Sequence, residues 1–217
     1  LYRNEYLNFL NILILKNYQI PSSTIPLKDK LVLTKKTNLN LESSSFTFCA
    51  WSYFDDICDL DICNFNDTFI ISSKNESIII KTQKEECILI QKYIIREWFL
   101  LSVIYENGIV TGYVNLQEIN VIHLENNLNF NAIHLIKFGG GTSGNGKLGC
   151  FGIFPKLSKS NIKTLFELGP REIHEPNFQF YLYYTPEKLS IFRQNYLEYH
   201  ETYNFPELFL SVCKIDL

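Results

Sequence analysis

The residues best suited to contact a ligand gather in a glycine-rich stretch, Gly139 to Gly146. Glycines let a ligand approach the backbone closely, and the Asn145 amide can both donate to and accept from sugar hydroxyls. Sugar sites also need a ring for stacking, which a strand tyrosine can supply. We therefore predict a non-catalytic ligand-binding set made of Gly140, Gly141, Asn145, Tyr113, Asn115 and Tyr53. The alternative stays open, because such a loop also fits a plain connection and strand tyrosines also fit a core; Trp51 and Trp98 we assign to the core.

The carboxylates and glycines do not match the patterns of two enzyme classes. Glycosidases on jelly-roll folds use two carboxylates on one face of a strand, but Glu85 and Glu86 are adjacent and would point to opposite sides. The glycine-rich stretch lacks the Lys-Ser/Thr ending of a phosphate-binding loop and leads into a strand. We predict that the chain is not an enzyme and needs no cofactor.

An acidic segment, residues 55–67, could offer oxygen ligands to Ca²⁺. It lacks the glycine and the bidentate glutamate of an EF-hand, so a solvated polar loop is favoured and ion binding stays an open alternative. Cys58 and Cys63 are not spaced as in a zinc ribbon, and the four histidines are dispersed. We predict no metal site.

The composition fits one folded domain with extensions. The chain has 217 residues, of which 46% are hydrophobic, 15% aromatic and 20% charged. With a net charge of −3, the chain lacks the excess of positive charge that is typical of nucleic-acid-binding proteins. The irregular spacing of the six cysteines favours reduced thiols in an intracellular protein. Residues 1–17 are too short and too polar to span a bilayer, and the absence of Met leads us to expect a piece of a longer protein.

Most of the chain has the pattern of short antiparallel strands. A helix is predicted over 1–17, followed by a linker between Pro21 and Pro26. Asn107-Gly108 predicts a hairpin turn, because both positions tolerate positive φ. The predicted strands are 31–33, 46–54, 69–72, 77–81, 87–91, 98–105, 109–116, 132–138 and 148–154. Many strands without alternating helices indicate a mainly β antiparallel sandwich.

Two further patterns concern helices. Ser158 is an N-cap candidate, Leu157 and Ile162 have the spacing of a hydrophobic staple, and Gly169-Pro170 can end the helix between them. The strand 98–105 is apolar on both faces, so something must cover its outer face. We expect that cover from helices at 1–17 and at about 186–200.

Three segments in order resemble laminin G-type domains of the concanavalin A-like jelly-roll family. Phe46 to Trp51 resembles the "FTISFW" strand, and Trp98 to Asn115 resembles the "WHHLAVVYDNGKLSLYVNG" hairpin. Lys147 to Pro170 resembles the ending "GKIGDVRIFNRALSPEQIKALYELGP". Its Leu-Phe-Glu-Leu-Gly-Pro version is most similar to the domain found in BEACH-domain proteins, the beige and neurobeachin group, and the Asn/Ile bias suggests an AT-rich genome such as that of a fungal beige homologue.

The resemblance implies a division into 1–24, a flanking helix and linker; 25–170, a concanavalin A-like sandwich; and 171–217, a helical extension packed on it. It implies a non-catalytic module of a large cytoplasmic protein that acts in vesicle trafficking, peripheral on endosomal or other vesicle membranes. That module would bind protein partners or scaffold adjacent helical repeats. A lectin-like domain that binds oligosaccharide is the alternative.

Overall fold

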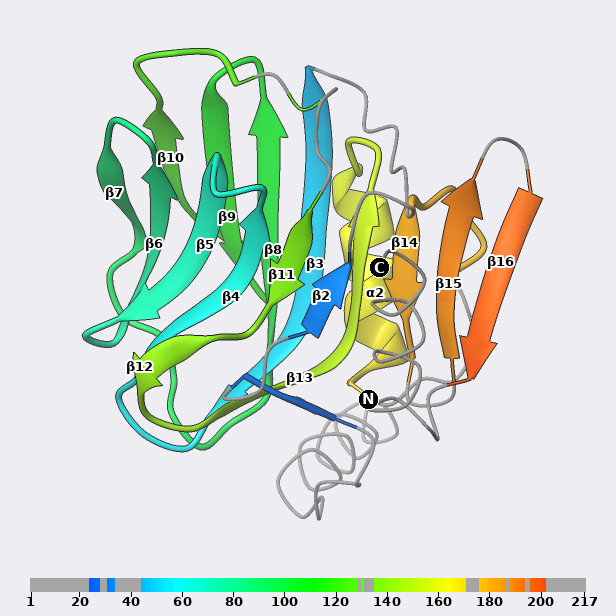
Figure 1. The fold of residues 1–217 in the computed structure, drawn as a ribbon, viewed down its shortest axis with the longest axis horizontal. Helices are drawn as coiled ribbons and strands as arrows, with labels where there is room; N and C mark the ends of the chain where they lie inside the picture. Colours follow the sequence, from blue (N-terminus) through cyan, green and yellow to red (C-terminus); the bar gives the residue numbers. More distant parts are fainter. Residues whose placement is uncertain are drawn as a thin grey trace, which may run out of the picture.

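The computed structural model describes residues 24–27, 31–33, 44–128, 130, 135–170, 176–185, 188–193 and 196–201. Two antiparallel sheets pack face to face (Figure 1). The mainly β antiparallel sandwich predicted from the strand pattern is confirmed. The helix predicted over 1–17 lies outside the described residues.

The larger sheet is built around a central strand that is among the most apolar in the chain, β3 (Ser45–Phe54). The strands follow in the order β10 (Gln117–His123), β9 (Ile109–Val114), β8 (Phe99–Glu106), β3, β13 (Gly146–Phe154), β14 (Leu182–Tyr184), β15 (Lys188–Arg193) and β16 (Tyr196–Glu201), and β1 (Ile25–Pro26) pairs with β13. The sheet therefore continues past residue 170.

The smaller sheet closes the other side of the sandwich. Its order is β2 (Leu31–Leu33), β11 (Ile136–Phe138), β4 (Asp59–Phe65), β5 (Phe69–Lys74), β6 (Ser77–Thr82) and β7 (Glu86–Ile90), and β12 (Gly141–Ser143) pairs with β4. The Asn107-Gly108 turn joins β8 to β9 with φ of 48° and 82°, as the sequence predicts.

Aromatic rings fill the space between the sheets. Phe46 of β3 lies at the centre, with its ring centroid 4.8 Å from that of Phe130 and 5.0 Å from that of Phe65. Phe69 and Tyr105 complete this group, each 5.7 Å from Phe46. All five side chains are fully buried. Many of the aromatic residues of the chain therefore lie in the interior between the sheets.

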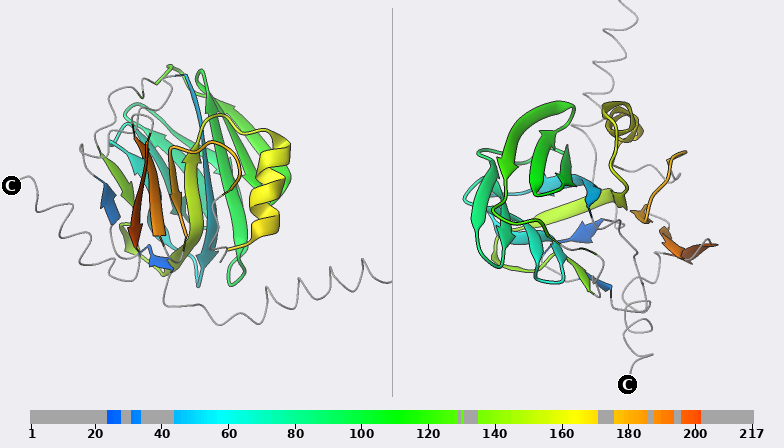
Figure 2. Two further views of the ribbon diagram at one scale, coloured as in Figure 1. Left: turned by 90° about the vertical axis from the view of Figure 1, so that its right-hand side faces the viewer. Right: turned by 90° about the horizontal axis from the view of Figure 1, so that it is seen from above.

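A second apolar layer covers the outer face of the larger sheet. The strand β8 is buried on both sides, as predicted: Leu101 and Val103 face the inner core, while Leu100 belongs to the outer layer. The helix α2 (Lys159–Leu168) supplies the cover through Ile162 and Leu165, together with Phe180 and Tyr183 from the following segment. Figure 2 shows this helix outside the sandwich.

The caps that the sequence predicts for this helix are confirmed. The Ser158 hydroxyl accepts from the Asn161 amide at 3.3 Å, and Gly169 ends the helix with a φ of 84°. Both staple residues, Leu157 and Ile162, are buried in the outer layer. Among the described residues this cover comes from α2, a helix of 10 residues, and not from a helix at 186–200. The part of the cover predicted from residues 1–17 lies outside the described residues.

Two other expectations are wrong. The predicted helix at 186–200 is replaced by β15 and β16, since the alternation of Leu189, Ser190 and Ile191 suits a strand and β14 offers an edge to pair with. The acidic segment 55–67 is not one loop, since residues 59–65 form β4. There Leu60 and Ile62 are buried, which fits a strand with a polar outer face.

Candidate functional site

The glycine-rich stretch is held tightly against neighbouring strands. The Gly140 amide donates to the Leu27 carbonyl at 2.7 Å, and the Gly140 carbonyl accepts from the Asp61 amide at 2.6 Å. A Cβ on Gly141 would lie 2.7 Å from the Leu60 Cα, so only glycine fits there. The backbone polar groups of Gly140 thus hold the fold together and do not face a ligand.

Gly144 fixes the end of this stretch. Its φ of 87° disfavours other residues, and an added Cβ would overlap the Cβ of Cys58. We expect Gly144→Ala to reduce the free energy of unfolding by about 2–4 kcal/mol in urea titrations. Gly169→Ala is the matched control, because Gly169 has a φ of 84° but nothing within 4 Å of the added Cβ; it should cost about 1 kcal/mol. Equal losses in the two variants would contradict this packing argument.

Next to the glycine-rich stretch, two aromatic side chains lie together at the end of the larger sheet. The rings of Tyr53 and Trp98 are 5.4 Å apart, and both residues are half-buried. Lys147, which pairs with Tyr53 across β3 and β13, has its Nζ 5.7 Å from the Tyr53 ring centroid. We call Tyr53, Trp98, Lys147, Asp55 and Arg96 the aromatic platform.

Charged groups frame the two rings. Lys147 Nζ lies 3.8 Å from an Asp55 carboxylate oxygen, and Arg96 Nε donates to the Asp55 carbonyl at 3.3 Å. Burial, and secondarily the negative charge of Asp55, raise the pKa of Tyr53, while Arg96 opposes this. The platform therefore offers ring faces, a carboxylate and two cations on one surface.

Asn145 is attached to the edge of this platform. Its backbone carbonyl accepts from the Asp55 backbone amide at 2.9 Å, and its backbone amide donates to an Asp56 carboxylate oxygen at 3.1 Å. The residue is exposed. Of the residues predicted from the sequence, Asn145 is thus joined through its main chain to Asp55, two residues after Tyr53, whereas Gly140 and Gly141 lie against Leu27 and β4.

Tyr113 and Asn115 do not belong to the aromatic platform. Tyr113 is only 5% exposed, within the layer beneath α2, and its hydroxyl donates to a Glu118 carboxylate oxygen at 2.8 Å. Asn115 turns the chain with a φ of 55°, and its side-chain oxygen accepts from the Leu100 amide at 2.9 Å. Trp98, which we assigned to the core, packs against the outer apolar layer but is only partly buried, immediately before β8 at the sheet end.

The buried Tyr113 hydroxyl leads to a prediction for alkaline pH. Burial, together with the hydrogen bond to Glu118 and its charge, raises the pKa of Tyr113 to about 12. Because the unfolded tyrosine ionises near pH 10, this group stabilises the fold below pH 10, and the contribution is lost as pH rises toward 12. We expect Tyr113→Phe to lose less stability than the parent chain between pH 9 and pH 11.5, measured by urea midpoints. An unchanged pH dependence would contradict the assignment.

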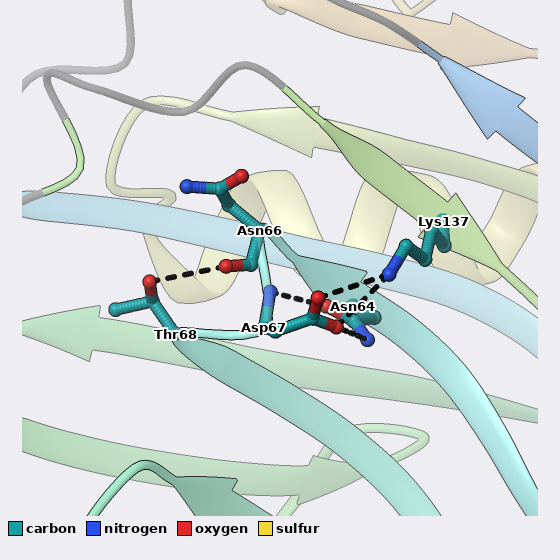
Figure 3. A network of polar contacts seen from close by, with 5 residues as sticks. All are labelled: Asn64, Asn66, Asp67, Thr68 and Lys137. Atoms are coloured by element: carbon teal, nitrogen blue, oxygen red, sulfur yellow. Dashed lines mark hydrogen bonds and ion pairs between the residues drawn. The ribbon is translucent and has the colours of Figure 1, made fainter.

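The polar residues of the β4–β5 turn bind one another (Figure 3). Asn64 donates to the Asp67 carboxylate at 2.7 Å and accepts from the Asp67 amide at 2.8 Å. Lys137 donates to both Asp67 oxygens, at 3.0 and 3.1 Å. This network fixes a turn in which Asn66 and Asp67 have positive φ. Among the described residues no group of three His, Cys, Asp or Glu side chains is placed to hold a metal ion.

Two cavities among the described residues are too small to serve as the main site. One, of about 70 Å³, is lined by Thr68, Thr82, Glu85 and their neighbours, near the β4–β5 turn; ligand pockets usually exceed about 300 Å³. Another, of about 10 Å³, lies beneath α2 against Cys49 and Trp51. Burial raises the pKa of the Cys49 thiol to about 12, which keeps it protonated at neutral pH. Neither of these two cavities is therefore a ligand pocket of ordinary size.

No family model matches the chain, and no curated protein matches it in sequence. Solved structures match it in fold. The receptor-binding domain of botulinum neurotoxin D superimposes with a TM-score of 0.57 at 17% identity, covering 70% of this chain and 46% of that one. A second structure of the serotype D binding domain gives a TM-score of 0.55 at 18% identity, covering 70% and 45%. Botulinum neurotoxin type C, which interacts with two ganglioside molecules, gives 0.53 at 18% identity, covering 66% and 42%.

These likenesses establish the fold class, a jelly-roll β-sandwich of the kind found in toxin binding domains. The chain spans less than half the length of each of the three solved structures. They give no support to membership of the BEACH group. In the part of the chain that the structure describes, no helix is long and apolar enough to cross a bilayer.

Proposed function

We propose that this domain is a carbohydrate-binding module whose site is the aromatic platform together with Asn145. The observation that carries the proposal is the partly buried pair of rings, Tyr53 and Trp98, framed by Asp55, Arg96 and Lys147. A sugar ring can stack on an aromatic face, while carboxylate, amide and guanidinium groups bind its hydroxyls. These are the groups that the lectin alternative, which we predicted from the sequence, requires.

The comparison with solved structures supports this proposal over trafficking. Botulinum neurotoxin type C interacts with gangliosides, which carry oligosaccharides, and the matched structures are binding domains without a stated catalytic role. The predicted BEACH-type scaffold, with its protein partners and endosomal location, rests on three sequence motifs alone. We therefore retain the lectin alternative as the working function and a non-catalytic role as part of it.

Contacts within the protein hold the polar groups around the rings in place. Asp55 is tied to Asn145 through the main chain and to Lys147 through its carboxylate, so the polar groups are positioned before a ligand arrives. Such preorganisation reduces the entropic cost of binding. The exposed Asn145 is the one polar group of the set that belongs to the glycine-rich stretch.

The test is a broad glycan array probed with the purified chain and with Asn145→Ala. We expect signal on a limited set of oligosaccharides, with dissociation constants in the micromolar range, and a clear reduction for Asn145→Ala. If a folded, monodisperse chain gives no signal on any glycan, the lectin function is wrong. A protein-interaction scaffold then becomes the better hypothesis.

A further inference from the structure

Three isoleucines project from the same end of the sandwich as the aromatic platform. Their exposed fractions are 53% for Ile57, 50% for Ile94 and 37% for Ile95. Ile57 lies in the loop between β3 and β4, and the other two lie in the segment between β7 and β8. In Figure 1 both segments run at the end of the sandwich where β12 lies. We call these three residues the isoleucine rim.

The two segments of the isoleucine rim are fastened to each other and to the core. The hydroxyl of Tyr93 accepts from the Cys58 amide at 3.4 Å, and the Tyr93 ring, which is 2% exposed, packs 4.5 Å from Phe54. On the other side, the Arg96 amide donates to the Phe54 carbonyl at 2.7 Å, with a φ of 61° at Arg96. The isoleucines therefore stand on an anchored backbone that keeps their side chains in solvent.

The size and shape of the rim limit what could cover it. A standard protein interface buries about 800 Å² on each partner, far more than three partly exposed isoleucines can supply. Neither the small cavity near the β4–β5 turn nor the one beneath α2 is lined by these isoleucines. A lipid surface needs neither area nor concavity, because each apolar group inserted into the bilayer interface contributes by itself.

The neighbouring side chains suit the interface of a bilayer. Trp98 and Tyr53 lie at the same end, and such amphipathic rings favour the level of lipid headgroups. Lys92 and Arg96 flank Ile94 and Ile95, but Lys92 Nζ lies 3.6 Å from a Glu76 carboxylate oxygen and Glu97 directly follows Arg96, so acidic groups balance this positive charge. This balance predicts insertion into neutral membranes without a requirement for anionic lipid.

We propose that the isoleucine rim inserts into the interfacial region of a phospholipid bilayer and so holds the aromatic platform at a membrane surface. This membrane contact goes beyond carbohydrate binding and does not depend on it, because the rim and the rings are separate side chains. Where both hold, the domain would meet glycans that are attached to lipids in the same bilayer. The partner is thus a lipid surface and not a protein groove.

The test is co-sedimentation of the full chain with phosphatidylcholine vesicles that contain no glycolipid, at lipid concentrations up to millimolar. We expect measurable binding by the parent chain and at least about tenfold weaker partitioning for the double variant Ile94→Ser/Ile95→Ser. Ile88→Ser is the matched control, because Ile88 on β7 is 53% exposed, as Ile57 is, but lies outside the rim. It should bind vesicles as the parent does.

Three results would overturn the proposal: no binding of the folded parent chain to neutral vesicles, equal loss in Ile88→Ser, or binding that requires phosphatidylserine and survives the double variant. The last result would indicate electrostatic adsorption alone. Binding of soluble glycans, measured in parallel, should be unchanged in the double variant. Failure of the glycan measurement with intact vesicle binding would count against the carbohydrate site and not against the rim.

Discussion

Replacing Trp98 with alanine is expected to weaken glycan binding about thirtyfold, which corresponds to about 2 kcal/mol. The indole is half of the ring pair with Tyr53, and it contributes a flat apolar face that no neighbouring side chain can replace. Because Trp98 is only partly buried, its removal should leave most of the fold intact. Isothermal titration calorimetry with an oligosaccharide found on the array would measure the loss.

Two variants separate stacking from general damage. Trp98→Phe keeps an aromatic face and should lose no more than about fivefold in affinity, an expectation based on the modest value of an aromatic contact. Tyr113→Phe removes a hydroxyl in the buried layer beneath α2 and should bind as the parent does. If Tyr113→Phe weakened binding as much as Trp98→Ala, the site would have to be moved toward β9.

The largest effect on stability is expected from Phe46→Ala. Phe46 is fully buried and its ring contacts those of Phe65, Phe69, Tyr105 and Phe130. Removing this ring leaves a cavity between the sheets, so the free energy of unfolding should fall by about 3–5 kcal/mol. Urea denaturation followed by circular dichroism would measure the fall.

Phe166→Ala provides a matched comparison in the outer layer. Phe166 stacks on Trp51 with the ring centroids 5.6 Å apart, but it is only partly buried on α2. Its loss should cost about 1–2 kcal/mol, because solvent can fill the vacated space. A cost equal to that of Phe46→Ala would mean that the outer layer is as integral to the fold as the interior.

The elements that were predictable are those whose signals are local. The Asn107-Gly108 turn, the Ser158 cap and the doubly apolar strand β8 each follow from a few adjacent residues. Of the strands that were missed, β12 pairs with the distant β4, whereas β10 and β16 pair with β9 and β15, the strands directly before them. In β10 every residue except Ile122 is exposed, so its sequence has no strong apolar alternation to reveal it.

The site was predictable only in part for a related reason. Tyr53 and Asn145 were found from residue type, but type alone cannot tell which rings stay at the surface. Tyr113 is buried beneath α2, whereas Trp98 is partly exposed because β8 begins just after it. The charged Arg96-Glu97 pair directly before Trp98 was the one local sign of a sheet end. Asp55, Arg96 and Lys147 could not be grouped without the register of β3 and β13.

The central claim is that a carbohydrate binds at the aromatic platform, and amide chemical-shift mapping tests it most directly. A ¹⁵N-labelled chain would be titrated with an oligosaccharide from the array. We predict that the largest shifts fall on Tyr53, Asp55, Trp98, Asn145 and Lys147 and on the Trp98 indole. Shifts confined to Thr82, Glu85 and the small cavity near the β4–β5 turn would contradict this account, because they would place the ligand away from the rings.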